Sequence, residues 1–187
     1  PFRPSEEDVN SYINFLKKTP IRNNILLLGS TPELRDALAE FYENSSIYVC
    51  DFSWKMLQET SGELKRGNPA KEIWMKCDWR NKGLPEKFFN VIMGDLVFMQ
   101  FAPREIGEFL QKMSRLLAPE GVFIVRARCK KRDLPSADIV INEALKKSED
   151  GKIAKVSIAL LWALYDLFVN SSLKFNLEEK YNVVLCL

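Results

Sequence analysis

The 187-residue sequence contains no histidine. Without an imidazole, the chain cannot use a Ser-His-Asp triad, a histidine general base or a histidine-assisted hydride transfer. Metal sites that need histidine ligands are excluded for the same reason. A reaction in which one reactant already carries an activated group does not need a histidine, because it requires mainly that the reactants be positioned.

Cysteine is also scarce. The four cysteines, Cys50, Cys77, Cys129 and Cys186, are widely spaced and form no Cys-x-x-Cys pair. This spacing predicts buried or half-buried free thiols and no metal site. We therefore expect a cytoplasmic protein, since thiols stay reduced in that compartment.

Long apolar runs are missing as well. The longest candidate, Val156 to Val169, carries Asp166 and is shorter than the roughly 18 residues that a membrane span needs. The amino end is polar and rich in acids, so we expect no signal peptide and no membrane partner. An apolar fraction of 47% with 28% charged residues predicts a single globular domain over residues 1–187.

The most informative feature of the sequence is an apolar run that ends in a glycine turn. Ile25–Leu28 shows no polar alternation, which is typical of a strand buried on both faces of a parallel sheet. Gly29 permits a sharp turn and a close approach of the backbone to a ligand. Ser30 or Thr31 can cap the helix that follows, and Glu33 completes a possible capping box with Ser30.

Asp51 ends a second predicted strand and lies 22 residues after Gly29. Nucleotide-binding βαβ units place a ribose-binding acid at about this spacing. Further strands are predicted over residues 72–77, 88–93 and 122–125, with a periodic helix over 106–117. Strand and helix alternate, which predicts an α/β fold with a doubly wound, mostly parallel sheet flanked by helices.

The order and spacing of these segments resemble the class I S-adenosylmethionine-dependent methyltransferases. The matching segments are residues 25–34, Val49–Leu57, Cys77–Trp79, Asn90–Asp95 and Leu117–Phe123. The resemblance covers residues 24–128 and implies a Rossmann-like core, S-adenosyl-L-methionine as cofactor and methyl transfer as activity. The turn Gly-x-Thr-Pro-Glu-Leu, which begins at Gly29, is a variant of the family's first motif.

The resemblance also implies roles for individual residues around the cofactor. Gly29, Ser30 and Thr31 would wrap its methionine part, Asp51 would bind the ribose diol, and Asp78 would face the adenine amino group. A carboxylate suits both contacts, because it accepts hydrogen bonds from hydroxyls and amines.

Other site residues follow from the same resemblance. Gly94 and Leu96 would border the transferable methyl, with Asp95 the best-placed catalytic base and Tyr12 a distant second. The apolar walls for the purine would come from three side chains that can stack on it, Phe52, Met56 and Trp79.

Two alternatives to methyl transfer can be compared with the sequence, and only the second remains open. A NAD-dependent oxidoreductase of the short-chain type needs a Tyr-x-x-x-Lys pair, and none of the five tyrosines has lysine four residues later. A non-catalytic relative would bind the nucleotide, or a protein partner, without transferring methyl. Leu27 stands where the family usually carries an acid, and the turn has a single glycine, so cofactor affinity decides between the enzyme and this relative.

Two segments bear on the substrate. Residues 1–20 predict an N-terminal helix capped by Ser5, of the kind that covers the cofactor cleft in many such enzymes. Arg126–Arg132 carries five cations in seven residues at a strand end, and so favours a small, anionic substrate. A net charge of only +2, and the absence of a Pro-Pro-aromatic motif after Asp95, make nucleic acid an unexpected partner.

The last segment, residues 129–187, predicts C-terminal helices and one final strand at Tyr181–Leu187. The resemblance implies an antiparallel pair of strands there. We therefore expect a missing final strand or a fragment of a domain. The sequence indicates neither the methyl acceptor nor the oligomeric state.

Overall fold

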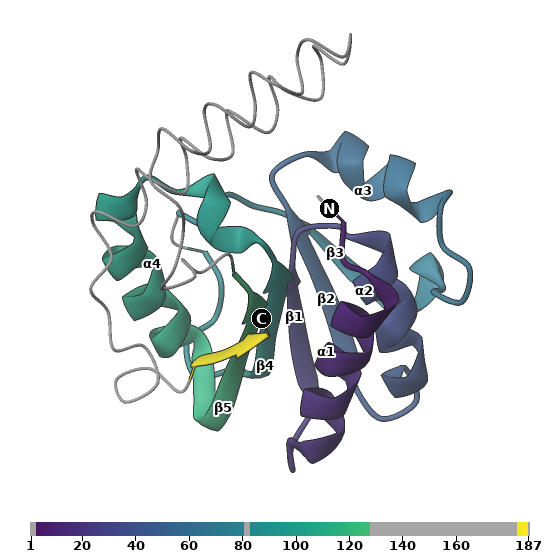
Figure 1. The fold of residues 1–187 in the computed structure, drawn as a ribbon, viewed down its shortest axis with the longest axis horizontal. Helices are drawn as coiled ribbons and strands as arrows, with labels where there is room; N and C mark the ends of the chain where they lie inside the picture. The colour runs from purple at the N-terminus through teal and green to yellow at the C-terminus, as the bar shows by residue number, and fades with distance from the viewer. Residues whose placement is uncertain (1–2, 81–82, 128–182, 187) are drawn as a thin grey trace, which may run out of the picture. The chain divides into compact units, whose positions relative to one another are not determined.

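The computed structural model describes residues 3–80 and 83–127 and the backbone of residues 183–186. These residues fall in one compact unit, Pro1–Ala127 with Asn176–Leu187. They form a sheet in the order β3-β2-β1-β4-β5-β6, in which every pairing is parallel (Figure 1). The strands are β1 (Asn24–Leu28), β2 (Ser46–Asp51), β3 (Glu72–Lys76), β4 (Phe89–Asp95), β5 (Leu117–Arg126) and β6 (Val183–Cys186).

The predicted doubly wound sheet is confirmed. The chain lays down β1, β2 and β3 toward one edge of the sheet and then returns to place β4, β5 and β6 on the other side of β1. Ile25–Leu28 of β1 is buried throughout, as a central strand of a parallel sheet requires. The strand order reverses between β1 and β4, and open α/β sheets bind ligands at the carboxyl ends of strands beside such a point.

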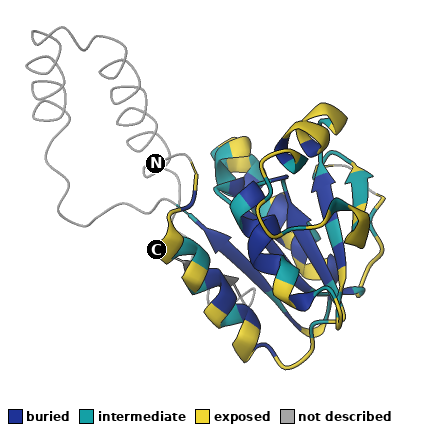
Figure 2. Cartoon of the chain, turned by 90° about the vertical axis from the view of Figure 1, so that its right-hand side faces the viewer, coloured by how far each residue is buried: buried dark blue, intermediate teal, exposed yellow. Residues whose placement is uncertain are grey.

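Helices cover both faces of this sheet. One face packs against α1 (Glu6–Lys18), α2 (Pro32–Leu38) and α3 (Trp54–Ser61) in a cluster that includes Tyr12, Leu16, Leu34, Leu38 and Leu57. On the other face, Phe109 of α4 (Pro103–Leu116) meets Phe123 of β5 edge-on, with ring centroids 6.0 Å apart. Figure 2 shows buried strands between helices whose outward sides are exposed.

The predicted N-terminal helix is confirmed, and its start is set by local hydrogen bonds. The Asp8 backbone N–H donates to Ser5 Oγ at 3.2 Å, and the Ser5 N–H donates to Asp8 Oδ2 at 2.8 Å. This is a reciprocal capping box, which satisfies N–H groups that the first helical turn leaves without partners.

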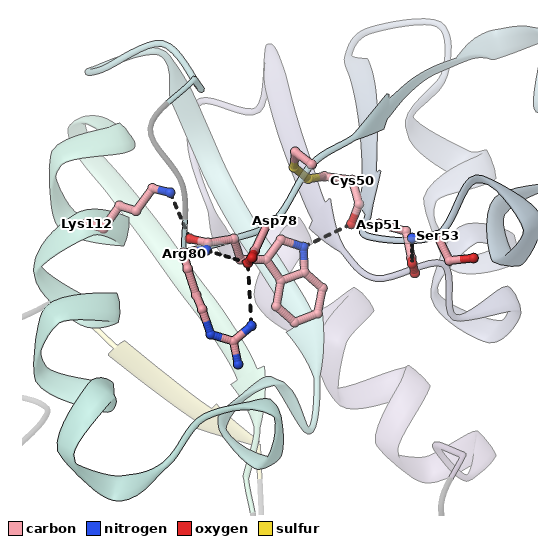
Figure 3. Close-up of a disulfide and its surroundings, with 8 residues drawn as sticks. Cys50, Asp51, Ser53, Asp78, Arg80 and Lys112 are labelled. Atoms are coloured by element: carbon pink, nitrogen blue, oxygen red, sulfur yellow. Dashed lines mark hydrogen bonds and ion pairs between the residues drawn. A yellow bond between two sulfur atoms is a disulfide. The ribbon is translucent and has the colours of Figure 1, made fainter.

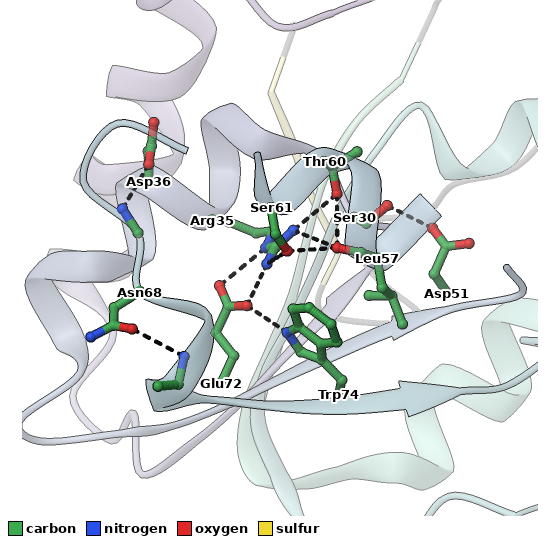
Figure 4. Close-up of polar contacts among 12 residues, drawn as sticks. Ser30, Arg35, Asp36, Asp51, Leu57, Thr60, Ser61, Asn68, Glu72 and Trp74 are labelled. Carbon is green, nitrogen blue, oxygen red and sulfur yellow. Dashed lines mark hydrogen bonds and ion pairs between the residues drawn. The ribbon is translucent and has the colours of Figure 1, made fainter. Parts of the chain in front are cut away.

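A buried ion pair joins α2, α3 and β3 (Figure 4). The side chains of Arg35 and Glu72 are both 0% exposed, and Arg35 Nη2 lies 2.7 Å from Glu72 Oε2. Arg35 also donates to Thr60 Oγ1 at 2.9 Å and to Ser61 Oγ at 2.8 Å, while Trp74 Nε1 donates to Glu72 at 2.7 Å. Buried charges need such a set of partners, so this network fixes α3 against the sheet.

Three sequence expectations differ from the structure. Cys50 and Cys77 form a disulfide, so the prediction of free thiols is wrong for this pair. β6 runs parallel to β5, where the resemblance implied an antiparallel pair. β5 begins at Leu117, earlier than predicted, and its pairing with β4 shifts register between Phe89 and Val91.

The C-terminal helices predicted within residues 129–187, Cys129 and the cations from Arg128 to Arg132 lie outside the described residues. Within the described part of the chain, no helix combines the length and the apolar character that crossing a bilayer requires. The same part of the chain contains no cluster of three or more carboxylates, cysteines or histidines that could hold a metal ion.

Candidate cofactor site

A cavity of about 570 Å³ lies at the carboxyl ends of β1, β2 and β4. Of the eleven site residues predicted from the sequence, eight line it: Gly29, Ser30, Thr31, Asp51, Phe52, Met56, Trp79 and Asp95. Its volume is within the range of small-molecule sites. The structure therefore brings most of the predicted residues together at the crevice where a parallel sheet binds ligands.

The turn after β1 has a backbone that suits glycine. Gly29 adopts φ +90°, and its N–H donates to the Cys50 carbonyl at 2.8 Å. Thr31 occupies the N-cap of α2 without a side-chain bond, and Pro32 occupies the first turn, where a missing N–H costs nothing. The predicted capping box is wrong, because Ser30 Oγ donates instead to Asp51 Oδ2 at 3.0 Å.

Asp51 is held in place from two sides. Its Oδ2 accepts the Ser30 hydroxyl, and its Oδ1 accepts the Ser53 backbone N–H at 2.9 Å. A carboxylate has about four lone-pair sites, so acceptor capacity remains on the cavity side. Phe52 is 71% exposed and Met56 is 45% exposed, which leaves apolar surface open beside this carboxylate.

Trp79 contacts the ends of β1 and β2, next to the disulfide of Cys50 that Figure 3 shows. Its indole N–H donates to the Cys50 carbonyl at 3.2 Å, and its ring atoms lie 3.8 Å from the position a Cβ would take on Gly29. The Trp79 carbonyl accepts Lys112 Nζ of α4 at 2.8 Å. Burial lowers the pKa of Lys112, although the nearby charge of Asp78 opposes this shift.

Three predicted residues do not line the cavity. Asp78 turns its carboxylate to the backbone N–H of Arg80, at 2.9 Å. Gly94 is packed beneath Val97 and Leu28, so that an added Cβ would lie 2.6 Å from Val97 Cγ1. Leu96 adopts φ +50° and donates its N–H to the Arg126 carbonyl at 3.1 Å. Their predicted contacts with the cofactor remain predictions.

Asp95 and Arg126 form a bidentate ion pair. Arg126 Nε donates to Asp95 Oδ1 at 2.6 Å and Nη2 to Asp95 Oδ2 at 2.9 Å, while Nη1 reaches Asp8 Oδ2 at 3.1 Å. The hydrogen bond to Asp95 raises the pKa of Arg126, against the opposing effect of its burial. Burial raises the pKa of Asp8, but the Ser5 hydrogen bonds and the Arg126 charge outweigh it, so the net shift is downward.

These contacts revise two expectations. The prediction that Arg126 is a free cation at the substrate opening is wrong, because its side chain is only 10% exposed and is neutralised by two carboxylates. Tyr12 is fully buried, where its hydroxyl donates to the Gly94 carbonyl and accepts the Arg126 N–H, both at 2.7 Å. Tyr12 thus ties α1 to the ends of β4 and β5.

Comparison with known proteins identifies the domain. Residues 29–121 match the family described as methyltransferase domain, the same segment that carries the glycine turn, Asp51 and the β4 end. Residues 29–121 therefore form a methyltransferase-type domain. Comparison with curated protein sequences finds no match.

Solved structures share the fold of this methyltransferase domain. A methyltransferase from Leishmania major superposes with a TM-score of 0.53 at 15% identity, covering 67% of this chain and 51% of that one. The YcgJ protein of Bacillus subtilis gives 0.54 at 14% identity, with 76% and 58% covered. Phosphoethanolamine N-methyltransferase 1 of Haemonchus contortus gives 0.52 at 18% identity, with 70% and 28% covered. The chain thus spans between 28% and 58% of these proteins.

Several residues that line the cavity were not predicted from the sequence. The polar ones include Arg3, Glu63, Arg80 and Gln100. Arg3 bridges Glu33 and Glu63, and Arg80 lies over the Phe101 ring at 4.9 Å from its centroid. These residues come from four separate segments, so no local spacing marks them, and only the adjacency of Arg80 to Cys77–Trp79 offered a signal.

The residues present fit the family's cofactor, S-adenosylmethionine. Asp51 retains acceptor capacity for a diol, Phe52 and Met56 offer surface for a purine, and the bare Gly29 backbone admits a close neighbour. Asp95 supplies a negative charge for the ammonium of a methionine group. The lining residues thus suit the ribose, the purine and the ammonium group of this cofactor.

Proposed function

We propose that this domain transfers a methyl group from S-adenosylmethionine to a small, anionic metabolite. The observation that carries the proposal is the cavity at the carboxyl ends of β1, β2 and β4, because it gathers the glycine turn, Asp51 and two exposed apolar side chains. The match of residues 29–121 to the methyltransferase family supports the same reaction.

Each wall residue has a defined task in this proposal. Asp51, oriented by Ser30 and Ser53, accepts the ribose hydroxyls, while Phe52 and Met56 cover the adenine. When bound, the cofactor supplies an electrophilic methyl whose bonding electrons stay with sulfur, so the protein mainly aligns the acceptor.

In this proposal Asp95 contributes a fixed negative charge and does not act as a base. Both of its oxygens already accept hydrogen bonds from Arg126, which leaves a fixed carboxylate facing the cavity. A fixed negative charge favours a bound sulfonium or ammonium and costs no reorganisation during the reaction. Tyr12 keeps the ends of β4 and β5 together behind it.

Arg80 supports an anionic acceptor. Its side chain is 48% exposed at the cavity, and its ion-pair contacts with Asp78 and Glu105 are long, at 3.5 and 3.6 Å. A guanidinium with donors to spare is suited to a carboxylate or phosphate. The nematode enzyme of this fold was solved with phosphoethanolamine, a small phosphate ester. We propose a cytoplasmic setting, where such metabolites are abundant, and no nucleic-acid partner.

The test is production of S-adenosylhomocysteine with a panel of matched anionic and neutral acceptors. We expect turnover with an anionic member, and Arg80→Gln should raise its KM several-fold at low salt with little change for the cofactor. Arg104→Gln is the matched control, because Arg104 is an exposed arginine of α4 that does not line the cavity. Equal KM values for the two variants would remove the anionic acceptor from the proposal.

A second candidate is a non-catalytic module that binds the nucleotide or a protein. It is favoured by Trp79, whose indole packs beside the single glycine of the turn, and by Leu27, fully buried where the family usually carries an acid. Saturable binding of S-adenosylhomocysteine without turnover on any acceptor would favour this module over the enzyme.

A further inference from the structure

The disulfide Cys50–Cys77 joins two elements of the cofactor site. Cys50 lies in β2, directly before Asp51, and Cys77 begins the segment Cys77–Arg80, which we call the cleft loop. The Cys50 carbonyl also accepts the N–H of Gly29 and the indole N–H of Trp79. One residue therefore connects the glycine turn, the ribose-binding strand and the cleft loop.

We propose that Cys50–Cys77 is a thiol-disulfide modification site that sets the affinity of the cofactor cleft. The proposal rests on the function proposed above. With the disulfide intact, the cleft loop is fixed covalently at Cys77. Hydrogen bonds also hold it, from the Cys77 N–H to the Asp51 carbonyl at 3.0 Å, from the Trp79 indole to the Cys50 carbonyl, from Lys112 to the Trp79 carbonyl and from Arg80 to the Gln100 carbonyl. The cavity that gathers the predicted site residues exists in this disulfide state.

The chemistry of the site permits exchange with a small thiol. Cys50 is fully buried, whereas Cys77 is half-buried and lines the cavity, so a thiolate can reach the Cys77 sulfur. Its attack forms a mixed disulfide at Cys77 and releases the Cys50 thiolate, which takes up a proton. A second small thiol then frees Cys77, so that two thiols are oxidised to one disulfide as the protein gains two electrons and two protons.

The direction of the effect follows from preorganisation. A loop held in its binding conformation loses less conformational entropy when the ligand binds. Reduction removes the covalent tie and leaves the cleft loop held by hydrogen bonds alone, so the reduced protein binds the cofactor more weakly. Disulfides in cytosolic proteins are commonly of this redox-sensing kind.

The test compares the oxidised and the dithiothreitol-reduced 187-residue chain in two measurements. Calorimetric titration with S-adenosylhomocysteine should give a Kd about fivefold higher after reduction. Hydrogen exchange should accelerate at the amides of Cys77 and Arg80, which donate to Asp51 and Asp78. Cys77→Ser should behave as reduced in both buffers. Cys186→Ser, which removes a cysteine of β6 several strands away, should keep the redox response.

The outcomes separate this inference from the proposed function. Equal Kd and equal exchange in the two redox states would overturn the inference while leaving the methyltransferase intact. Alkylation of Cys50 and Cys77 in the native, unreduced protein would overturn it as well. Failure of S-adenosylhomocysteine to bind in both states, with exchange still accelerated by reduction, would instead refute the proposed function and retain a redox-controlled loop.

Discussion

The two walls of the cofactor cavity are held by different kinds of contact. On the wall formed by β1, β2 and α3, Asp51 is fixed by Ser30, which follows the adjacent strand of the same βαβ unit, and by Ser53, two residues later. Ser53 in turn caps α3. The wall formed by the cleft loop and the β4 end depends on contacts from distant segments. Trp79 is held by Lys112, and Asp95 by Arg126. The first wall is a local motif, and the second exists only when the whole sheet is assembled.

This difference predicts where mutations act. Changes to the part-buried hydrogen bonds of Asp51 in the first wall should affect ligand binding with modest cost to the fold, since solvent can replace these bonds. Changes that remove long-range contacts should first appear as lost stability.

The largest effect is expected from Arg35, which anchors α3 of the first wall by a long-range, fully buried contact. Arg35→Met leaves Glu72 buried without its countercharge, and the free energy of unfolding should fall by about 3–5 kcal/mol. Urea denaturation measures this, with exposed Arg104→Met as control. The double variant Arg35→Met/Glu72→Met should recover much of the loss. A double variant as unstable as the single one would show that the pair is not the cause.

Asp51→Ala tests the local wall. It should weaken S-adenosylhomocysteine binding by about 1.5–3 kcal/mol, the cost of a hydrogen bond to a charged group, which is roughly a tenfold to 150-fold rise in Kd. Asp78→Ala is the matched control in the long-range wall. Its carboxylate is turned toward Arg80, so its effect on Kd should be smaller. If the two variants rank in the opposite order, the adenine contact of Asp78 outweighs the ribose contact.

Alanine substitutions at Gly94 and Gly107 compare the effect on stability of a methyl group added at a packed position and at an open one. Gly94→Ala places a Cβ 2.6 Å from Val97 and 3.0 Å from the Leu28 carbonyl, so it should destabilise the protein by about 1–3 kcal/mol. Gly107→Ala adds a methyl to α4 in open space and should stabilise by about 0.5–1 kcal/mol. Thermal unfolding of the two variants measures both changes in stability, a decrease for Gly94→Ala and an increase for Gly107→Ala. A stabilising Gly94→Ala would contradict the packing at the β4 end.

The smallest effect concerns Asp8, whose contact with Arg126 reaches the long-range wall from α1. The folded-state pKa of Asp8 lies below its ordinary value, so its ionised form stabilises the fold above about pH 4, and this contribution disappears as pH falls through the folded pKa. Asp8→Asn should therefore lower stability by up to about 1 kcal/mol at neutral pH. The stabilities of the variant and the wild type, measured by urea titration, should converge as the pH falls through the folded-state pKa of Asp8. A constant difference would exclude the carboxylate as the cause.

The sequence predicted the local wall well and the long-range wall poorly, for a physical reason. An apolar run, a glycine and an acid at the right spacing determine where Gly29 and Asp51 lie, because β1 and β2 are adjacent parallel strands. No spacing indicates that Arg126 would be buried against Asp95 rather than exposed, since the two lie on different strands. Sequence spacing could not predict the Cys50–Cys77 disulfide either, because only the register of β2 with β3 brings the two residues together.

The most direct test of the central claim is equilibrium titration of wild-type protein with S-adenosylmethionine. A cavity built from the glycine turn and Asp51 predicts saturable one-to-one binding in the micromolar range, about −8 kcal/mol, with competition by S-adenosylhomocysteine. Absence of binding at millimolar concentration would contradict it, because the cavity would then be a remnant of the fold without its cofactor.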